Sequence, residues 1–162
     1  MKDLAKTIEI GLNAKERAGV CALLDTLLAD EFVLYTKTRK FHWNVTGTHF
    51  SELHKFFESQ YEALDDIMDE VAERSRALGT VATGTLKEFV VNTRLKEAPG
   101  KNPEATAMIA NLLADHETLA RCLRADLETA QHKYHDAGTA DFMTGLMEQH
   151  EKMAWMLRAY LQ

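Results

Sequence analysis

An apolar ladder between residues 50 and 71 is the feature that most constrains how this chain folds. Apolar or aromatic side chains recur there at intervals of three and four residues, which is the spacing of one face of an α-helix. Polar residues fill the positions between them, so the segment predicts one long amphipathic helix. We expect it to begin between residues 48 and 51 and to end at Leu78, where Gly79 offers a left-handed stop. The ladder consists of Phe50, Leu53, Phe57, Tyr61, Leu64, Met68 and Val71.

Three further long helices and one short helix are predicted along the chain. Asn13 followed by Glu16 forms a capping box, so a first helix begins there and continues toward Trp43. The other predictions are a short helix over 86–91 within the long connection 79–102, a third long helix from Asn102-Pro103-Glu104 to about Lys133, and a last helix that opens at Gly138-Thr139. Four long helices with one long middle connection predict an all-α four-helix bundle in which that connection is a crossover.

Length and composition indicate one helical domain. The chain has 162 residues, of which 46% are hydrophobic and 27% are charged, and this suits a single bundle with a sizeable core. We divide it into a short polar arm over residues 1–12 and one domain over residues 13–162. No apolar run reaches the length of a membrane span, and the first residues lack a signal-peptide core, so we expect a cytoplasmic protein without a membrane partner. Cys21 and Cys122 lie in apolar helical patterns, which indicates free thiols.

Five side chains that could bind a metal ion lie in or just before the long helix. His54 and Glu58 are four residues apart, as are Asp69 and Glu73, so each pair shares one helix face; His42 precedes them. Imidazole and carboxylate ligands suit both Fe(II) and Fe(III). His54 and Asp69 would lie about 22 Å apart along one helix, too far to bind the same ion. Two copies packed antiparallel about a two-fold axis would bring them together, so we hypothesise a site shared between subunits.

The residues around these side chains match a family pattern. The run HWN-x-x-G-x-x-F-x-x-L-H over residues 42–54 is followed by E-x-x-Y and D-E-x-A-E-R, and GTADFMTGLMEQHEKMAWMLRAYL occupies residues 138–161. This pattern closely resembles the Dps proteins, the small ferritin-like proteins named for DNA protection during starvation. The resemblance covers almost the whole chain after residue 13 and implies a ferritin-like four-helix bundle. The family's ferroxidase ligands carry over to His42, His54, Glu58, Asp69 and Glu73, and many members have aspartate at the Glu58 position.

The resemblance also implies an enzyme, a ferroxidase whose metal is iron. Dps proteins generally oxidise Fe(II), preferably with hydrogen peroxide, at two-fold dimer interfaces within a cage of twelve subunits. They store ferric mineral and thereby protect DNA from Fenton damage under oxidative stress, and we expect the same function here. Asp136 and Asp141 flank the start of the last helix, where the resemblance places a three-fold pore for iron. Stabilisation of the first helical turn is the alternative interpretation of Asp141.

Two residues beside the predicted ligands have open roles. Trp43 follows the first ligand, and the resemblance suggests that it intercepts stray oxidising equivalents. An aromatic side chain that fills an interface is an equally good interpretation. Arg74 follows the last ligand and could pair with Asp66 or Glu70, although a solvated surface pair is the default.

Direct DNA binding is the competing function. The formal charge of −6 argues against broad attraction to nucleic acid. The two lysines of the N-terminal arm are balanced by two acids, and no basic tail follows the last helix. Lys37, Arg39 and Lys40 form the only candidate basic patch. Because phosphate binding needs several clustered cations, a nucleoid-compacting, nucleoid-associated protein is the disfavoured alternative.

The remaining histidines carry weaker signals. No E-x-x-H pair occurs in the chain, which argues against a di-iron site inside a single bundle. His132 and His135 have helical i, i+3 spacing, but the preference of cations for a helix carboxyl end explains them without a metal. His116 and His150 are interpreted as ordinary helix residues.

Overall fold

The computed structural model describes residues 8–162, and these residues form five helices and no strand. The helices are α1 (Ala14–Asn44), α2 (Phe50–Ala77), α3 (Leu86–Asn92), α4 (Ala105–Lys133) and α5 (Ala137–Ala159). Their order confirms the predicted all-α bundle of four long helices, with the short helix α3 in the connection between the second and the third of them.

Local sequence sets the ends of the first two helices. The Asn13 side-chain oxygen accepts hydrogen bonds from the backbone N–H groups of Lys15 (2.9 Å) and Glu16 (3.0 Å). The Glu16 carboxylate accepts one in return from the Asn13 backbone N–H at 2.8 Å. These contacts confirm the predicted capping box. Gly79 follows α2 with a φ of 92°, the left-handed conformation expected of a glycine stop.

The last two helices begin close to their predicted starts. The segment 102–104 was expected to place the cap of α4 at its asparagine, but the cap is Glu104, two residues later. Glu104 keeps an extended backbone with a ψ of 160°, so the preceding proline lies outside the helix. Asp136 caps α5, because its side chain accepts a hydrogen bond from the backbone N–H of Thr139 at 2.9 Å.

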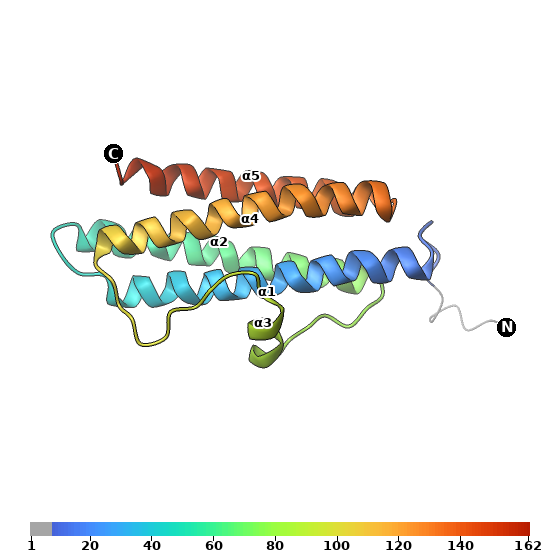
Figure 1. Ribbon diagram of the computed structural model, residues 1–162, viewed down its shortest axis with the longest axis horizontal. Helices are drawn as coiled ribbons and strands as arrows, with labels where there is room; N and C mark the ends of the chain where they lie inside the picture. The colour runs from blue at the N-terminus through green and yellow to red at the C-terminus, as the bar shows by residue number, and fades with distance from the viewer. Residues whose placement is uncertain (1–7) are drawn as a thin grey trace.

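The long helices pair as two antiparallel hairpins, α1 with α2 and α4 with α5 (Figure 1). α2 ends where α1 begins, and α4 begins at the opposite end, so the connection between them runs back along the bundle. This arrangement confirms the predicted crossover. α1 packs against α2 and α4, whereas α5 packs against α4 and α2, so α1 and α5 lie diagonally opposite each other.

A buried carboxylate and an aromatic contact of α1 bind the crossover segment. Asp30 accepts hydrogen bonds from the Thr93 hydroxyl (2.9 Å), the Arg94 backbone N–H (2.6 Å) and Arg94 Nε (2.7 Å). Phe32 stacks on Phe89 of α3 with ring centroids 4.3 Å apart. These contacts hold α3 against the outer side of α1 (Figure 1).

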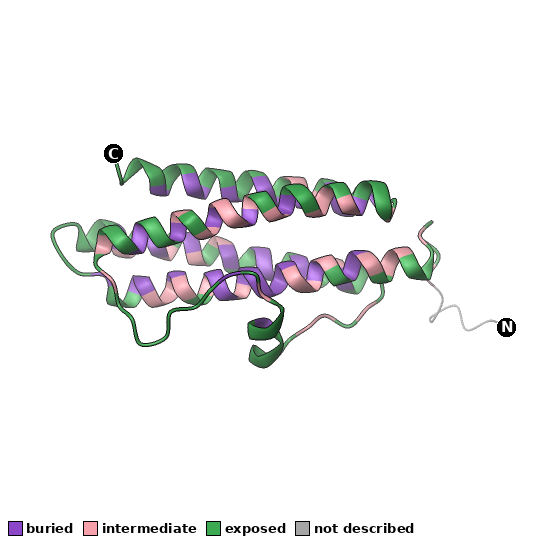
Figure 2. Cartoon of the chain, in the orientation of Figure 1, coloured by how far each residue is buried: buried purple, intermediate pink, exposed green. Residues whose placement is uncertain are grey.

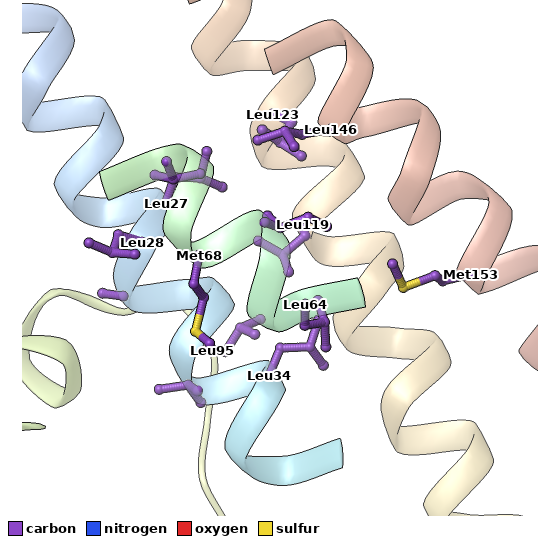
Figure 3. Packing of buried hydrophobic residues seen from close by; sticks show 14 of the residues in the cluster. Leu27, Leu28, Leu34, Leu64, Met68, Leu95, Leu119, Leu123, Leu146 and Met153 are labelled. Atoms are coloured by element: carbon purple, nitrogen blue, oxygen red, sulfur yellow. The ribbon is translucent and has the colours of Figure 1, made fainter. Parts of the chain in front are cut away.

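The inward faces of the four long helices form a continuous apolar core (Figure 2). Figure 3 shows part of this core, with Leu34 of α1, Leu64 of α2, Leu123 of α4 and Leu146 of α5 among its buried members. Most of the apolar ladder of α2 belongs to this core, while Phe50 is exposed and Tyr61 is half-buried. The buried members are Leu53, Phe57, Leu64, Met68 and Val71.

A chain of polar side chains crosses the apolar core. Glu31 of α1 lies 2.8 Å from Nε2 of His150 on α5, and Nδ1 of His150 lies 2.9 Å from Nδ1 of His116 on α4. All three are fully buried. Among the described residues, Glu31 Oε2, His116 Nε2 and both amide atoms of the buried Gln60 have no hydrogen-bond partner. The two histidines therefore link α1, α4 and α5 through buried polar contacts. Their interpretation as ordinary helix residues missed this role.

Two remaining features of the chain are its cysteine thiols and its N-terminal arm. Cys21 is buried, Cys122 is half-buried, and both are free as predicted. Residues 1–7 of the predicted arm lie outside the described residues, but Ile8 is close to Gly79: a Cβ atom added to that glycine would meet Ile8 Cδ1 at 1.8 Å. Over residues 8–162, no helix is long and apolar enough to cross a membrane.

Candidate metal centre

His42, near the end of α1, and His54, in the first turns of α2, lie face to face. Their rings are stacked with centroids 3.7 Å apart and an interplanar angle of 21°. Nδ1 of His42 is 2.7 Å from the backbone oxygen of His54, and Nδ1 of His54 is 2.9 Å from the backbone oxygen of His42. The reversal of the chain between α1 and α2 thus brings the first two predicted ligands together.

These reciprocal contacts require a proton on Nδ1 of each ring. A backbone carbonyl oxygen can only accept a hydrogen bond, so Nδ1 of each ring must carry the proton and donate it. In a neutral imidazole the other nitrogen, Nε2, then holds a free lone pair. Carbonyl partners of this kind are what orients metal-binding histidines in proteins. His42 and His54 are therefore arranged as two nitrogen donors of defined tautomer and orientation.

Glu58 lies one turn after His54 on α2 and is half-buried. The Tyr61 hydroxyl donates a hydrogen bond to Glu58 Oε1 at 3.3 Å, and the Tyr61 ring meets the His42 ring edge-on at 5.2 Å and 78°. Loss of hydration and the nearby Glu58 carboxylate raise the pKa of Tyr61, so its phenol remains a donor at neutral pH. The sequence predicted Tyr61 only as a packing residue, although the E-x-x-Y spacing was a signal for this contact.

Asp69 and Glu73 lie on the same helix and are exposed to solvent. They follow His54 by about four and five helical turns, which places them about 22 Å or more along α2 from the histidine pair. Within residues 8–162, no three histidine, cysteine or acidic side chains converge on a common metal position. One chain therefore brings together His42 and His54, with Glu58 nearby, but it does not bring Asp69 and Glu73 to them.

Arg39 lies among three aromatic side chains, one of which, Tyr61, contacts the His42 ring. The Arg39 guanidinium lies 4.9 Å from the Tyr61 ring centroid and 5.7 Å from those of Tyr35 and Trp43. Arg39 also donates a hydrogen bond to the Tyr35 hydroxyl. Trp43 is 65% exposed, which is unusual for so large an apolar side chain.

The two acidic residues predicted to line a pore have different environments. Asp136 is buried; its carboxylate accepts hydrogen bonds from the Thr139 hydroxyl at 2.5 Å and from Arg74 at 3.2 Å. Arg74 also donates from Nε to the Thr139 hydroxyl at 2.9 Å. The predicted pairing of Arg74 with a carboxylate of its own helix is therefore wrong, because the start of α5 packs within its reach. Asp141 is exposed.

The candidate basic patch is largely occupied by contacts within the chain. Lys37 donates hydrogen bonds to the Lys96 backbone oxygen (2.8 Å) and to Asp115 (2.5 Å). Lys40 donates to backbone oxygens of the crossover at 2.6 and 3.3 Å. Arg39 is held among the aromatic rings, so the three cations anchor local structure and do not form one open patch.

Comparisons with known proteins agree with this fold. The Ferritin-like domain family model matches residues 21–162. The chain is 46% identical over 155 residues to an uncharacterized low temperature-induced protein of Nostoc sp.. This match covers 96% of this chain and 87% of the Nostoc protein. It is 37% identical over 142 residues to DNA protection during starvation protein 2 of Bacillus anthracis, and this match covers 88% of this chain and 96% of the relative.

A solved structure extends the likeness to the whole bundle. The crystal structure of a Dps protein from Vibrio cholerae O1, described as a member of a broad superfamily of ferritin-like diiron-carboxylate proteins, has a TM-score of 0.89 and 30% sequence identity. The match spans 97% of this chain and 98% of that one. Sequence and structure together show that this chain belongs to the Dps family of ferritin-like proteins.

Proposed function

We propose that this protein is an iron-storage and detoxification cage that oxidises Fe(II) at sites shared between two subunits. Membership of the Dps family supports iron binding, iron storage and DNA protection in general terms. The observation that best supports a shared ferroxidase site is the reciprocal hydrogen bonding of His42 and His54, which leaves the Nε2 nitrogen of each ring available to bind a metal ion. These two donors need carboxylates to complete an iron site, and the chain exposes Asp69 and Glu73 at the other end of the same helix.

A two-fold axis near the middle of α2 would join the two halves of the site. Residues 54 and 69 exchange places about a point between residues 61 and 62 when two copies of the helix run antiparallel. Each dimer would then contain two identical sites. The exposed Trp43 and the exposed Val90 and Val91 of α3 support a surface that another subunit covers.

The proposed chemistry assigns each side chain a part. His42 and His54 bind Fe(II) as neutral nitrogen donors, while Asp69 and Glu73 of the neighbouring subunit supply negative charge that favours the ferric product. Glu58 assists a second iron ion. Two Fe(II) ions each give one electron to hydrogen peroxide, which takes up two protons and leaves as two water molecules. Preference for peroxide over oxygen rests on the family resemblance, as does the storage of ferric mineral in a dodecamer.

Iron would pass into the cage through pores at the start of α5. Asp141 is exposed and free to line such a pore, where carboxylates concentrate cations. Asp136 is already engaged by Arg74 and Thr139, so its contribution would be to shape the pore. DNA would be protected because iron and peroxide are both consumed. The alternative, direct nucleoid compaction, is less well supported because the lysines of the basic patch are engaged within the chain.

An anaerobic iron assay tests this proposal. The purified protein is loaded with Fe(II) without oxygen, substoichiometric peroxide is added, and ferric absorbance is followed. We expect fast oxidation with a soluble product in the wild type and in Asp66→Ala, which removes an exposed carboxylate from the same helix outside the proposed site. We expect the rate of Asp69→Ala to fall toward that of buffer. Equal rates in wild type, Asp69→Ala and buffer would reject the ferroxidase function.

A further inference from the structure

Tyr61 contacts both the histidine pair and Glu58. Its ring contacts the His42 ring edge-on at 5.2 Å, on the side of the histidine pair. Its hydroxyl donates a hydrogen bond to Glu58 Oε1 at 3.3 Å, on the side of the carboxylate. No other side chain in the described part of the chain makes a hydrogen bond to Glu58.

Two further side chains contact the ring of Tyr61 and restrict its position. The Arg39 guanidinium covers it at 4.9 Å from the ring centroid. Tyr35 meets it edge-on, with centroids 6.1 Å apart and an interplanar angle of 90°. Packing of the ring therefore restricts where the phenol oxygen lies beside Glu58.

A hydrogen bond that restricts the side chain has a larger effect on Glu58 than it would have on an aspartate. The glutamate side chain has one more rotatable bond, and ordering a long flexible side chain at a binding site costs conformational entropy. The hydrogen bond from Tyr61 restricts the carboxylate before any metal arrives. A carboxylate offers about four lone-pair sites, so one donor leaves the rest available to a cation.

We propose that Tyr61 is a positioning residue that holds Glu58 in place for the second iron ion. Tyr61 itself binds no metal; it acts through the carboxylate. This inference rests on the proposed function, because it presupposes a two-ion site. It goes beyond that function by assigning the occupancy of the second position to a tyrosine that supplies no ligand atom.

The test is an anaerobic Co(II) titration of the assembled protein, with Co(II) as a redox-stable substitute for Fe(II) and visible absorbance as the readout. Wild type should bind two ions per site in two resolvable steps. Tyr61→Phe keeps the ring and removes the hydroxyl, so the second dissociation constant should rise by about two- to tenfold, the effect of one lost hydrogen bond. The first constant should stay unchanged. Tyr160→Phe, which removes a half-exposed phenol from α5, is the matched control and should leave both steps unchanged.

A double-mutant cycle separates positioning from general damage. In a Glu58→Ala background, Tyr61→Phe should have no further effect on the weakened second step, because the carboxylate through which it acts is gone. A second step that weakens equally in both backgrounds would overturn the proposal, as would equal weakening of both steps in Tyr61→Phe.

The same titration distinguishes failure of this inference from failure of the proposed function. Two-step binding that is identical in wild type and Tyr61→Phe would overturn the role of Tyr61 and leave the iron site intact. A wild-type protein that binds no second ion would overturn the two-ion site and this inference together.

Discussion

Replacing His150 with leucine should strongly destabilise the bundle, because it strands a buried carboxylate. His150 is the only hydrogen-bond partner of Glu31 among the described residues, and Glu31 Oε2 already has none. Both side chains are fully buried. Leaving a buried polar group without its hydrogen-bond partner typically costs about 1–3 kcal/mol, and more if the group is charged. For a chain of this size, about 1–3 kcal/mol corresponds to a fall in Tm of roughly 2–12 °C, at about 2–4 °C per kcal/mol.

A triple replacement should behave in the opposite way. Glu31→Leu, His116→Leu and His150→Leu together remove the whole polar chain and two of its partnerless atoms. Well-packed apolar residues of similar volume in place of a buried polar network are often neutral or stabilising by about 1–4 kcal/mol. Assembly and metal content must be equal in all variants, because subunit association and bound ligands shift Tm.

These two predictions are tested by measuring the Tm of wild type, His150→Leu and the triple variant by calorimetry at one subunit concentration. We expect His150→Leu to melt well below both of the others. This expectation would be refuted if His150→Leu melted with the wild type, or if the triple variant were the least stable of the three.

Three further predictions concern the same bundle. Gly19→Ala would place its Cβ 2.2 Å from the Tyr134 ring, so overpacking of about 1–3 kcal/mol should outweigh the gain in helix propensity and lower Tm. Burial and the neighbouring His150 lower the pKa of His116 well below its usual value. Below pH about 6.5 the unfolded chain therefore binds more protons than the folded chain, so the free energy of unfolding should fall as the pH drops. His116→Leu should flatten this pH dependence in thermal melts between pH 5 and 7, about the range in which free histidine titrates. Asp136→Ala removes both the cap of α5 and a partner of Arg74, so urea unfolding should show a loss of about 1–3 kcal/mol, whereas Asp141→Ala should change stability by less than about 0.5 kcal/mol.

Sequence reasoning succeeded where the signal is local. The capping box at Asn13 and the glycine stop at Gly79 depend on residues within one turn, so they could be predicted with their positions. The all-α class and the crossover followed from helical periodicity and from the length of one connection. The start of α4 was misplaced by two residues, because local cap signals do not determine where the chain must leave the crossover.

Contacts between distant segments could not be predicted in the same way. Arg74 and Asp136 lie 62 residues apart in sequence and meet only because α5 begins beside the end of α2. The pairing of Glu31 with His150 spans 119 residues and a diagonal of the bundle. Even the reciprocal bonds of His42 and His54 depend on the register between α1 and α2, although the motif named both residues as ligands.

Mixing two inactive variants tests the shared site most directly. Subunits with His54→Ala and subunits with Asp69→Ala are unfolded, combined in equal amounts and reassembled, and peroxide-driven Fe(II) oxidation is measured in verified mixed cages. If ligands come from opposite chains, half of the dimers are mixed and each of these has one intact site of two, so activity should recover to about a quarter of the wild-type value. Recovery near that level would support a site built by two subunits. No recovery above the separate variants would contradict it, because a site within one chain would remain broken in every subunit.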